Sequence, residues 1–197
     1  MRRTPSDRVG LVARCTALIL VAPVFVWADS VLQEESHSAG SLIEFAREGM
    51  IEARYCFLIT LDDLGQPQAR LMDAFEPEAD MTVWMATKAD TRKVRQLRYD
   101  PRATLAYVTG GGNGYVTLVG RARLVDDADE KLRRWKTGWE AFYPGGPSDP
   151  DFLLLRFTPA RIELMDPTRD VGAGPFSPAI LVRQDTAWVV HEGIDSH

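Results

Sequence analysis

The sequence predicts a mainly β fold, an antiparallel barrel with a few covering helices. Short runs rich in aromatic and β-branched residues far outnumber the segments with helical periodicity. Most of these runs are joined by short turns containing Gly, Pro, Asp or Asn, which connect antiparallel neighbours and not the strands of a parallel α/β sheet. The chain has 197 residues, of which 45% are hydrophobic. This is the size of one globular domain with additional residues at its ends.

The first 28 residues differ from the rest of the chain. Four arginines precede an apolar run of about 13 residues, which ends in Val-Trp-Ala before Asp29. This order is typical of a secretory signal peptide, and the run is short for a membrane span, which needs roughly 20 residues. We expect residues 1–28 to be such a signal, with an uncleaved anchor or a misassigned start codon as alternatives. The mature chain is then periplasmic or extracellular, without stable membrane insertion, and otherwise cytoplasmic.

The remaining chain is strongly acidic. Residues 1–28 hold four of the 23 basic and one of the 28 acidic residues, so 19 basic and 27 acidic residues remain, a net charge of −8. Such a chain repels nucleic acid, which we exclude as a partner. Cys56 is then the one cysteine, and its apolar neighbours predict a buried thiol. The three histidines lie near the chain ends without ligand spacing, so we expect no metal site.

The first half of the chain predicts two helices and three strands. Ser41 can cap a first helix, together with Glu44 three residues later, and the apolar stripe of that helix includes Met50. A second, short helix starts at Asp90 or Thr91 and stops at the Tyr-Asp-Pro of 99–101, because a residue before proline avoids the helical region. The strands between the helices are expected at 55–61, 68–75 and 81–87.

The second half predicts four more strands. A glycine loop at 110–114 separates two of them, and Gly120 marks a bend. A helix is expected from Asp127 to about Phe142, carrying Leu132, Trp135 and Trp139. The tail from Pro167 could form two short strands or one strand–turn–strand unit, so 167–197 is an extension of uncertain structure. The strands are expected at 102–109, 115–125, 152–159 and 161–166.

Basic residues gather around the start of the short helix. Thr91, Arg92 and Lys93 open it, Thr87 ends the preceding strand, and Arg70 lies in an earlier strand. A helix N-terminus offers free backbone amides and the positive end of the helix dipole, and acidic residues, not basic ones, favour its first turn. A bound phosphate would explain the basic residues. A solvated charged face, or a charge that guards a sheet edge, are alternatives that the spacing leaves open.

Three segments of the chain resemble the pyridoxamine 5′-phosphate oxidase-like, FMN-binding split-barrel superfamily, in its general stress protein 26 branch. These segments are RLMDAF, WMATKADTRKVRQLRYDPRATLAY and YVTLVGRARLVDD. The resemblance covers residues 38–166 and implies a six- to seven-stranded antiparallel split barrel. It also implies a homodimer that binds FMN in preference to FAD or a deazaflavin. Thr91, Arg92 and Lys93 match the element that holds the FMN phosphate. The other matching flavin contacts are Arg70, Leu71, Met72, Asp73, Ala86, Thr87 and Tyr115, the last at the position of a glutamine in the true oxidases.

The resemblance leaves two functions open. The basic substrate-binding element of the true oxidases is absent after Asp166, and Met165 stands where this branch often carries tryptophan. Vitamin B6 oxidation is therefore not implied. The first hypothesis is a stress-related, FMN-dependent oxidoreductase acting on an unidentified small molecule, with no assigned catalytic residue because the flavin performs the chemistry. The second is a non-catalytic flavin-binding storage or sensor protein. Trp135 and Trp139 are read either as flavin-cover or dimer residues, or as core aromatics.

Overall fold

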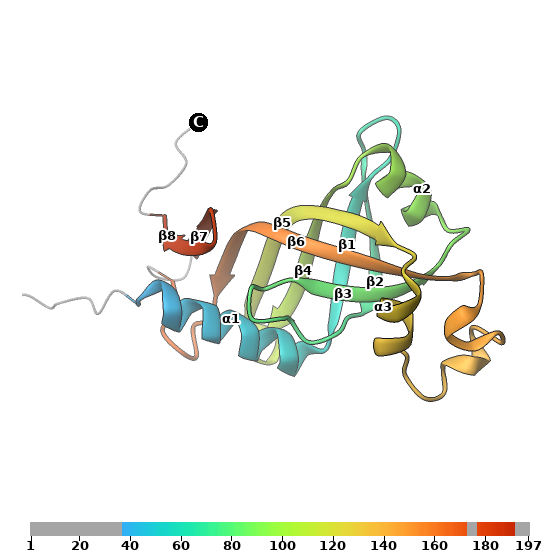
Figure 1. The fold of residues 1–197 in the computed structure, drawn as a ribbon. Coiled ribbons are helices and arrows are strands. Elements are labelled where there is room, and N and C mark those ends of the chain that lie inside the picture. The colour runs from blue at the N-terminus through green and yellow to red at the C-terminus, as the bar shows by residue number, and fades with distance from the viewer. Residues whose placement is uncertain (1–36, 173–176, 192–197) are drawn as a thin grey trace, which may run out of the picture. The chain divides into compact units, whose positions relative to one another are not determined.

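The computed structural model describes residues 37–172 and 177–191, which contain three α-helices and one eight-stranded antiparallel sheet (Figure 1). The expected signal peptide at 1–28 lies outside the described residues. The helices are α1 (Ala39–Ala53), α2 (Arg92–Tyr99) and α3 (Ala128–Arg133). The strands are β1 (Tyr55–Leu61), β2 (Pro67–Asp73), β3 (Val83–Lys88), β4 (Arg102–Thr109), β5 (Gly114–Val125), β6 (Phe152–Met165), β7 (Ala179–Gln184) and β8 (Ala187–Val190).

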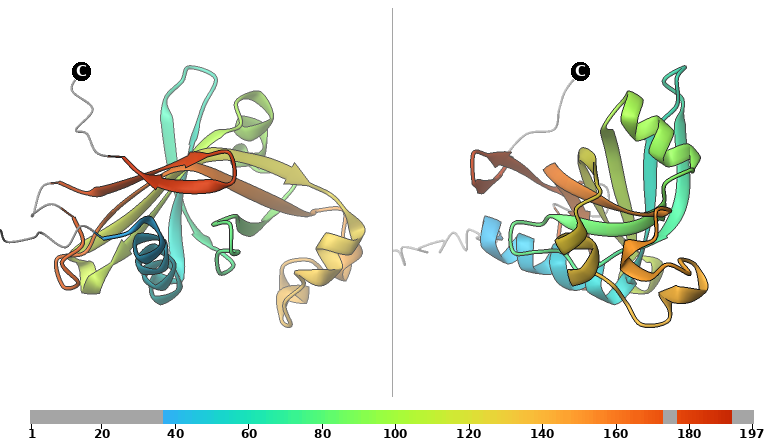
Figure 2. Two further views of the ribbon diagram at one scale, coloured as in Figure 1. Left: turned by 60° about the vertical axis from the view of Figure 1, so that its left-hand side comes forward. Right: turned by 45° about the vertical axis from the view of Figure 1, so that its right-hand side comes forward.

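The sheet is a barrel that stays open on one side. Its strands follow the order β2-β1-β4-β5-β6-β7-β8, and β6 pairs with β3 through its first half and with β7 through its second. Within the described residues, β2 and β3 meet only through the isolated bridge between Ala74 and Met85. Both the antiparallel pairing and the unclosed sheet confirm the predicted mainly β split barrel. The sheet has eight strands and not six or seven, because the tail adds β7 and β8. Helix α1 lies against β4 and β5, and α2 packs against β1 and β5 (Figures 1 and 2).

The start of α1 differs from the prediction. Ser38 is the N-cap, and its side-chain oxygen accepts a hydrogen bond of 3.1 Å from the amide of Ser41. The helix therefore begins at Ala39 and not at Leu42, because the side chain of Ser38 satisfies the otherwise free amide of Ser41. Glu44 does not complete a capping box and instead lies 3.8 Å from Arg47 in an ion pair.

Two predictions in the second half are wrong. The strands expected at 152–159 and 161–166 form the single strand β6, because the β5–β6 register shifts between Val119 and Gly120, opposite Pro159. This bulge accommodates the proline. A Cβ at Gly120 would overlap the carbonyl oxygen of Thr158, so the close approach of β5 to β6 at this bulge requires glycine.

The helix expected over 127–142 ends at Arg133. Gly138 then adopts φ 92°, which an α-helix cannot contain.

The sheet buries apolar residues on both faces. Cys56 is fully buried in the main cluster beneath α1, as predicted, and burial raises the pKa of its thiol to about 11. A second cluster on the opposite face of β3 and β6 contains Trp84 and Phe152. Trp135 and Trp139 pack edge-on against Phe152, with ring centroids 5.3 and 5.7 Å away, and so contribute to this second cluster. The predicted core position of Trp84 is confirmed, since it is 4% exposed.

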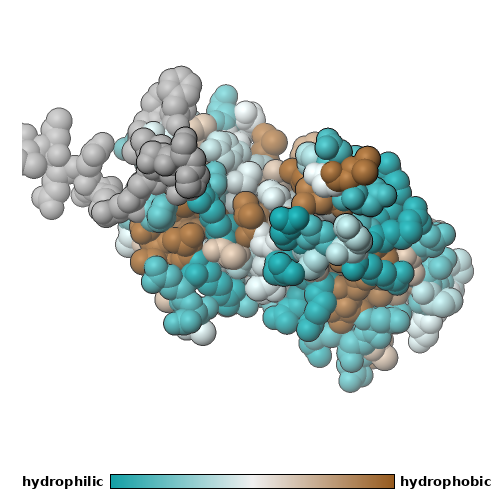
Figure 3. Space-filling model, turned by 90° about the horizontal axis from the view of Figure 1, so that it is seen from above, coloured by the Kyte–Doolittle hydropathy of each residue, from teal (hydrophilic) through white to brown (hydrophobic). Residues whose placement is uncertain are grey.

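The face seen in Figure 3 is largely hydrophilic, with separate apolar areas. In the tail, β7 and β8 form a hairpin that extends the sheet beside β6. Among residues 37–172 and 177–191, no helix is long and apolar enough to cross a membrane. The same residues contain no cluster of three or more His, Cys, Asp or Glu side chains that could hold a metal ion.

Candidate functional site

Arg70 is anchored at the point where β1 and β2 approach α2. Its Nη1 donates to the hydroxyl of Thr60 at 2.6 Å and to the carbonyl of Leu58 at 3.1 Å. Its Nη2 donates to the side-chain oxygen of Gln96, on α2, at 2.9 Å. All three acceptors are neutral. The guanidinium is therefore held in one orientation, and no acidic side chain of residues 37–172 and 177–191 forms an ion pair with it.

Two further cations lie beside Arg70 at the start of α2. Arg92 is exposed and Lys93 is half-buried, and neither forms a hydrogen bond or an ion pair within the described residues. Burial, and then the charge of Arg70, lower the pKa of Lys93. Burial, and then the charge of Arg92, lower the pKa of Arg70. The three side chains therefore form a cluster of like charge that a bound anion would stabilise.

The backbone at the start of α2 also lacks partners. The hydroxyl of Thr91, the N-cap residue, donates to the carbonyl of Lys88 at 3.1 Å instead of accepting from the helix. The first amides that bond within the helix are those of Val94 and Arg95. The helix has no acidic residue in its first turn. The helix dipole and the free amides thus add to the three cations, and together they fit a phosphate group.

The other predicted site residues are spread along β2, β3 and β5. Leu71 points outward and is 59% exposed, whereas Met72 and Thr87 are buried. Asp73 at the end of β2 is half-buried, and Ala86 on β3 packs against the second cluster.

Tyr115 is distant from Arg70 and Lys93 within one chain. It pairs with Val108 and Met165 near the start of β5, whereas the amide of Ala122 bonds to Pro101, just after α2. Tyr115 lies seven positions before Ala122 along β5, a distance of about 23 Å. Arg70 lies on β2, three strands away from β5 in the sheet. The structure therefore brings Arg70, Thr91, Arg92 and Lys93 together and does not bring Tyr115 to them.

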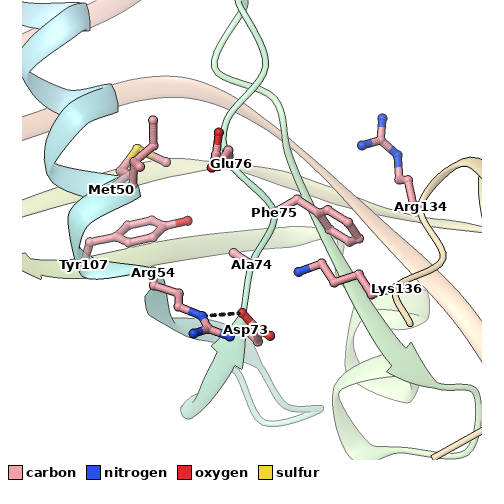
Figure 4. Close-up of a pocket in the computed structure, with 10 residues that line it drawn as sticks. Met50, Arg54, Asp73, Ala74, Phe75, Glu76, Tyr107, Arg134 and Lys136 are labelled. Carbon is pink, nitrogen blue, oxygen red and sulfur yellow. Dashed lines mark ion pairs between the residues drawn. The ribbon is translucent and has the colours of Figure 1, made fainter. Parts of the chain in front are cut away.

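A pocket of about 480 Å³ opens where the chain leaves β2 (Figure 4). Its walls come from the end of α1, from β4 and from the segment that follows α3. The residues drawn in Figure 4 include Met50, Arg54, Asp73, Phe75, Tyr107 and Lys136.

The pocket combines an aromatic wall with unpartnered polar groups. The Nζ of Lys136 lies 4.2 Å from the ring centroid of Phe75 and has no acidic partner within the described chain. Tyr107 is 2% exposed, and its hydroxyl points toward the end of β2 without a hydrogen-bond partner in the described residues (Figure 4). Burial, and then the neighbouring Cys56, raise the pKa of Tyr107, so the phenol keeps its proton. Asp73 Oδ1 also lacks a hydrogen bond and lies 3.6 Å from Arg54 Nε.

Of the residues that line this pocket, sequence reasoning assigned Asp73 to a site and missed Tyr107 and Lys136. The alternation of β4 could have marked Tyr107 as inward-facing, since Ala103 and Leu105 precede it on the same face. No local pattern identifies Lys136, because its position depends on how the chain folds back after α3.

Comparisons with known proteins agree with this architecture. The family model described as pyridoxamine 5′-phosphate oxidase like matches residues 43–171. General stress protein 26 of Bacillus subtilis (strain 168) is 29% identical over 105 residues, which are 52% of this chain and 73% of that protein. A solved structure of a protein related to general stress protein 26, from Clostridium acetobutylicum, is 25% identical with a TM-score of 0.59, over 66% of this chain and 92% of that one. The general stress FMN/FAD binding protein from Xanthomonas citri is 26% identical with a TM-score of 0.54, over 66% of this chain and 92% of that one.

Proposed function

Because this chain belongs to the pyridoxamine 5′-phosphate oxidase-like family, we propose that it binds FMN and transfers electrons between the flavin and a small molecule. The observation that carries the proposal is the uncompensated cluster of Arg70, Arg92 and Lys93 at the start of α2. The name of the Xanthomonas citri relative, an FMN/FAD binding protein, supports a flavin as the ligand. The names of the relatives in the general stress group are the basis for extending a stress-related role to this chain.

The cation cluster suits the phosphate monoester of FMN. Such a group carries a charge of about −1.5 to −2 at neutral pH and offers three acceptor oxygens. Arg70 would bind the phosphate through its guanidinium, whose orientation is fixed by Thr60 and Gln96. Lys93 would contribute a positive charge, and the free amides of α2 would donate hydrogen bonds. FAD has no terminal phosphate monoester, so we favour FMN.

The pocket at the far end of β2 favours an enzyme over a passive flavin carrier. Bound FMN would supply hydride or electron transfer at its N5 atom. Phe75 would offer a flat apolar surface to a substrate, Lys136 a cation, and the protonated Tyr107 hydroxyl a hydrogen bond. The pocket shares Asp73 with the expected flavin contacts, so a substrate bound there would lie next to the flavin. A storage or sensor protein would need no room for a second ligand.

We also propose that the functional unit is a homodimer. The outer face of β1, β2 and β4 exposes Phe57 (44%), Leu71 (59%) and Val108 (57%). Phe57 is paired directly with Leu71, and Val108 with Tyr115, so these side chains share one face. A second copy on this face would cover the apolar side chains and bring its own Tyr115 toward the flavin.

The dimer is tested by sedimentation of the purified chain and of the Leu71→Glu variant. We expect a dimer for the native chain and a monomer with reduced FMN affinity for the variant. A native monomer that holds one FMN per chain would refute the dimer. We propose in addition that residues 1–28 are removed on export, which mass spectrometry of the native N-terminus tests, since an intact Met1 excludes cleavage.

The oxidoreductase proposal is tested with the FMN-loaded protein. We expect the flavin absorbance to bleach when a nicotinamide donor is added without oxygen, and to recover in air. Flavin that is bound stoichiometrically but is not reduced by any nicotinamide or small-molecule donor would favour the storage or sensor protein. A protein that binds neither FMN nor FAD would refute the flavin proposal itself.

A further inference from the structure

A second hollow, of about 570 Å³, lies on the outer face of β3, β5 and β6 beside α3. We call it the arginine hollow, because four of its lining residues are Arg123, Arg133, Arg134 and Arg156. None of Arg70, Arg92 and Lys93 lines it. It is therefore distinct from the proposed FMN phosphate site.

The carboxylates of the arginine hollow are already engaged. Arg134 Nη2 donates to Glu78 at 2.6 Å, and Arg134 Nε donates to Glu130 at 3.2 Å. Arg133 donates to the same Glu130 at 2.7 Å. Asp127 caps α3 by accepting a hydrogen bond of 2.9 Å from the amide of Glu130. Glu78 and Glu130 thus compensate Arg133 and Arg134, and Asp127 is occupied as the helix cap.

Arg123 and Arg156 remain without an ion-pair partner in the described part of the chain. They stand directly opposite each other in the β5–β6 ladder, an arrangement in which like charges destabilise a sheet. The Nε of Arg156 is buried and donates no hydrogen bond to any described residue, which is costly for a charged group.

Asp80 also interacts with Arg156, and its carboxylate is already occupied. Its carboxylate accepts hydrogen bonds from the amide and hydroxyl of Thr82 at 2.9 and 3.0 Å and lies 3.9 Å from Arg183. Burial opposes ionisation of Asp80, but the hydrogen bonds from Thr82 and the charges of Arg183 and Arg156 lower its pKa. The unmet hydrogen-bonding capacity of Arg156 and Arg123 therefore points to a ligand from outside the chain.

We propose that the arginine hollow binds a phosphate group, either free or carried by a small organic molecule. Facing Cα atoms of an antiparallel pair lie about 4.5–5.5 Å apart, so both guanidinium forks can reach one anion. A phosphate dianion has enough acceptor oxygens for both forks and would cancel the repulsion between them. A monovalent anion such as chloride has neither the charge nor the bidentate geometry.

The test is a phosphate titration followed by NMR of the arginine Nε–Hε groups in the full chain saturated with FMN, so that the α2 cluster is filled. We expect saturable shifts of the Arg123 and Arg156 signals with inorganic phosphate, and none with chloride at equal ionic strength. Arg123 is exposed, so its substitution should leave the fold intact, and Arg123→Gln keeps part of the side-chain stem. We expect phosphate to bind about tenfold or more weakly to both Arg123→Ala and Arg123→Gln.

The matched control is Arg98→Ala, which removes an exposed arginine from α2 and should leave the titration unchanged. Glycerol phosphate is the second arm. If glycerol phosphate binds as tightly as inorganic phosphate, the hollow recognises the phosphate group alone, whether the group is free or part of an organic molecule. If glycerol phosphate binds more weakly, the ligand is the free ion. Shifts that do not saturate, that chloride reproduces, or that persist unchanged in Arg123→Ala would overturn the proposal. If the protein holds no FMN, the same titration in Lys93→Ala isolates the hollow, so the two proposals fail independently.

Discussion

Replacing Lys93 with alanine should weaken FMN binding far more than riboflavin binding. Lys93 is half-buried beside Arg70 and has no hydrogen-bond or ion-pair partner among the described residues. Its charge would therefore be fully available to the FMN phosphate. A charge-assisted hydrogen bond contributes about 1.5–3 kcal/mol, and about 1.4 kcal/mol is a factor of ten in affinity. We expect a ten- to hundredfold loss of FMN affinity, with riboflavin affinity unchanged because riboflavin has no phosphate.

The same substitution should not destabilise the flavin-free protein. In the absence of an anion Arg70 repels Lys93, which after burial is the second cause of the lowered pKa of Lys93. Removing one charge relieves this repulsion, so urea unfolding without FMN should give an equal or higher free energy of unfolding. A loss of FMN binding combined with unchanged stability would locate the effect in the site and not in the fold.

The assay is fluorescence quenching of FMN and of riboflavin, each titrated with native protein, Lys93→Ala and Arg98→Ala. Arg98 lies in the last turn of the same helix and is exposed, so its loss tests the effect of removing any positive charge from α2. Raised salt should weaken FMN binding to the native protein more than to Lys93→Ala. Equal losses in Lys93→Ala and Arg98→Ala, or equal losses of FMN and riboflavin, would refute the assignment of the phosphate to this cluster.

Three further predictions follow from the fold. Gly120→Ala should lower the free energy of unfolding by about 1–3 kcal/mol or more, measured in urea, because its Cβ would overlap the carbonyl of Thr158; an unchanged midpoint would contradict the bulge geometry. The unfolded chain holds the Lys93 proton more tightly than the folded one, so flavin-free stability should rise with pH between the lowered pKa and 10.5, less so in Lys93→Ala; equal pH slopes in the two proteins would contradict this. Cys56 should resist alkylation at pH 8 until urea unfolds the chain, since its buried thiol has a pKa of about 11; rapid labelling of the native protein would argue against its burial.

Local signals in the sequence were sufficient for much of the barrel. The predicted ranges of β1 and β4 match the observed bounds, because both strands alternate buried and exposed residues between clear turn signals. The continuity of β6 could not be predicted, since Pro159 reads as a strand end unless the bulge opposite Gly120 is known. The helix after β5 was predicted too long because Trp135 and Trp139 have helical spacing, although they reach the second cluster from turns around Gly138.

The candidate site was predictable only where it depended on a helix start. Thr91, Arg92 and Lys93 are adjacent in the sequence, and the structure puts them at the first turn of α2, beside Arg70. The pocket near Tyr107 and Lys136 joins segments from α1, β4 and the chain after α3. Such a pocket depends on packing between distant segments, which periodicity does not reveal.

Because β6 pairs on both sides, the barrel can close only late in the synthesis of the chain at the ribosome. Strand β3 is made early, but its main partner is the first half of β6, which is made only after β4, β5 and α3. Until then β3 and one side of β5 are unpaired edges that carry apolar side chains such as Val83 and Met85. Exposed edges of this kind favour association between incomplete chains. A nascent chain that ends before Phe152 should therefore be prone to aggregation and a target for chaperones, whereas one that extends past Met165 can complete the barrel.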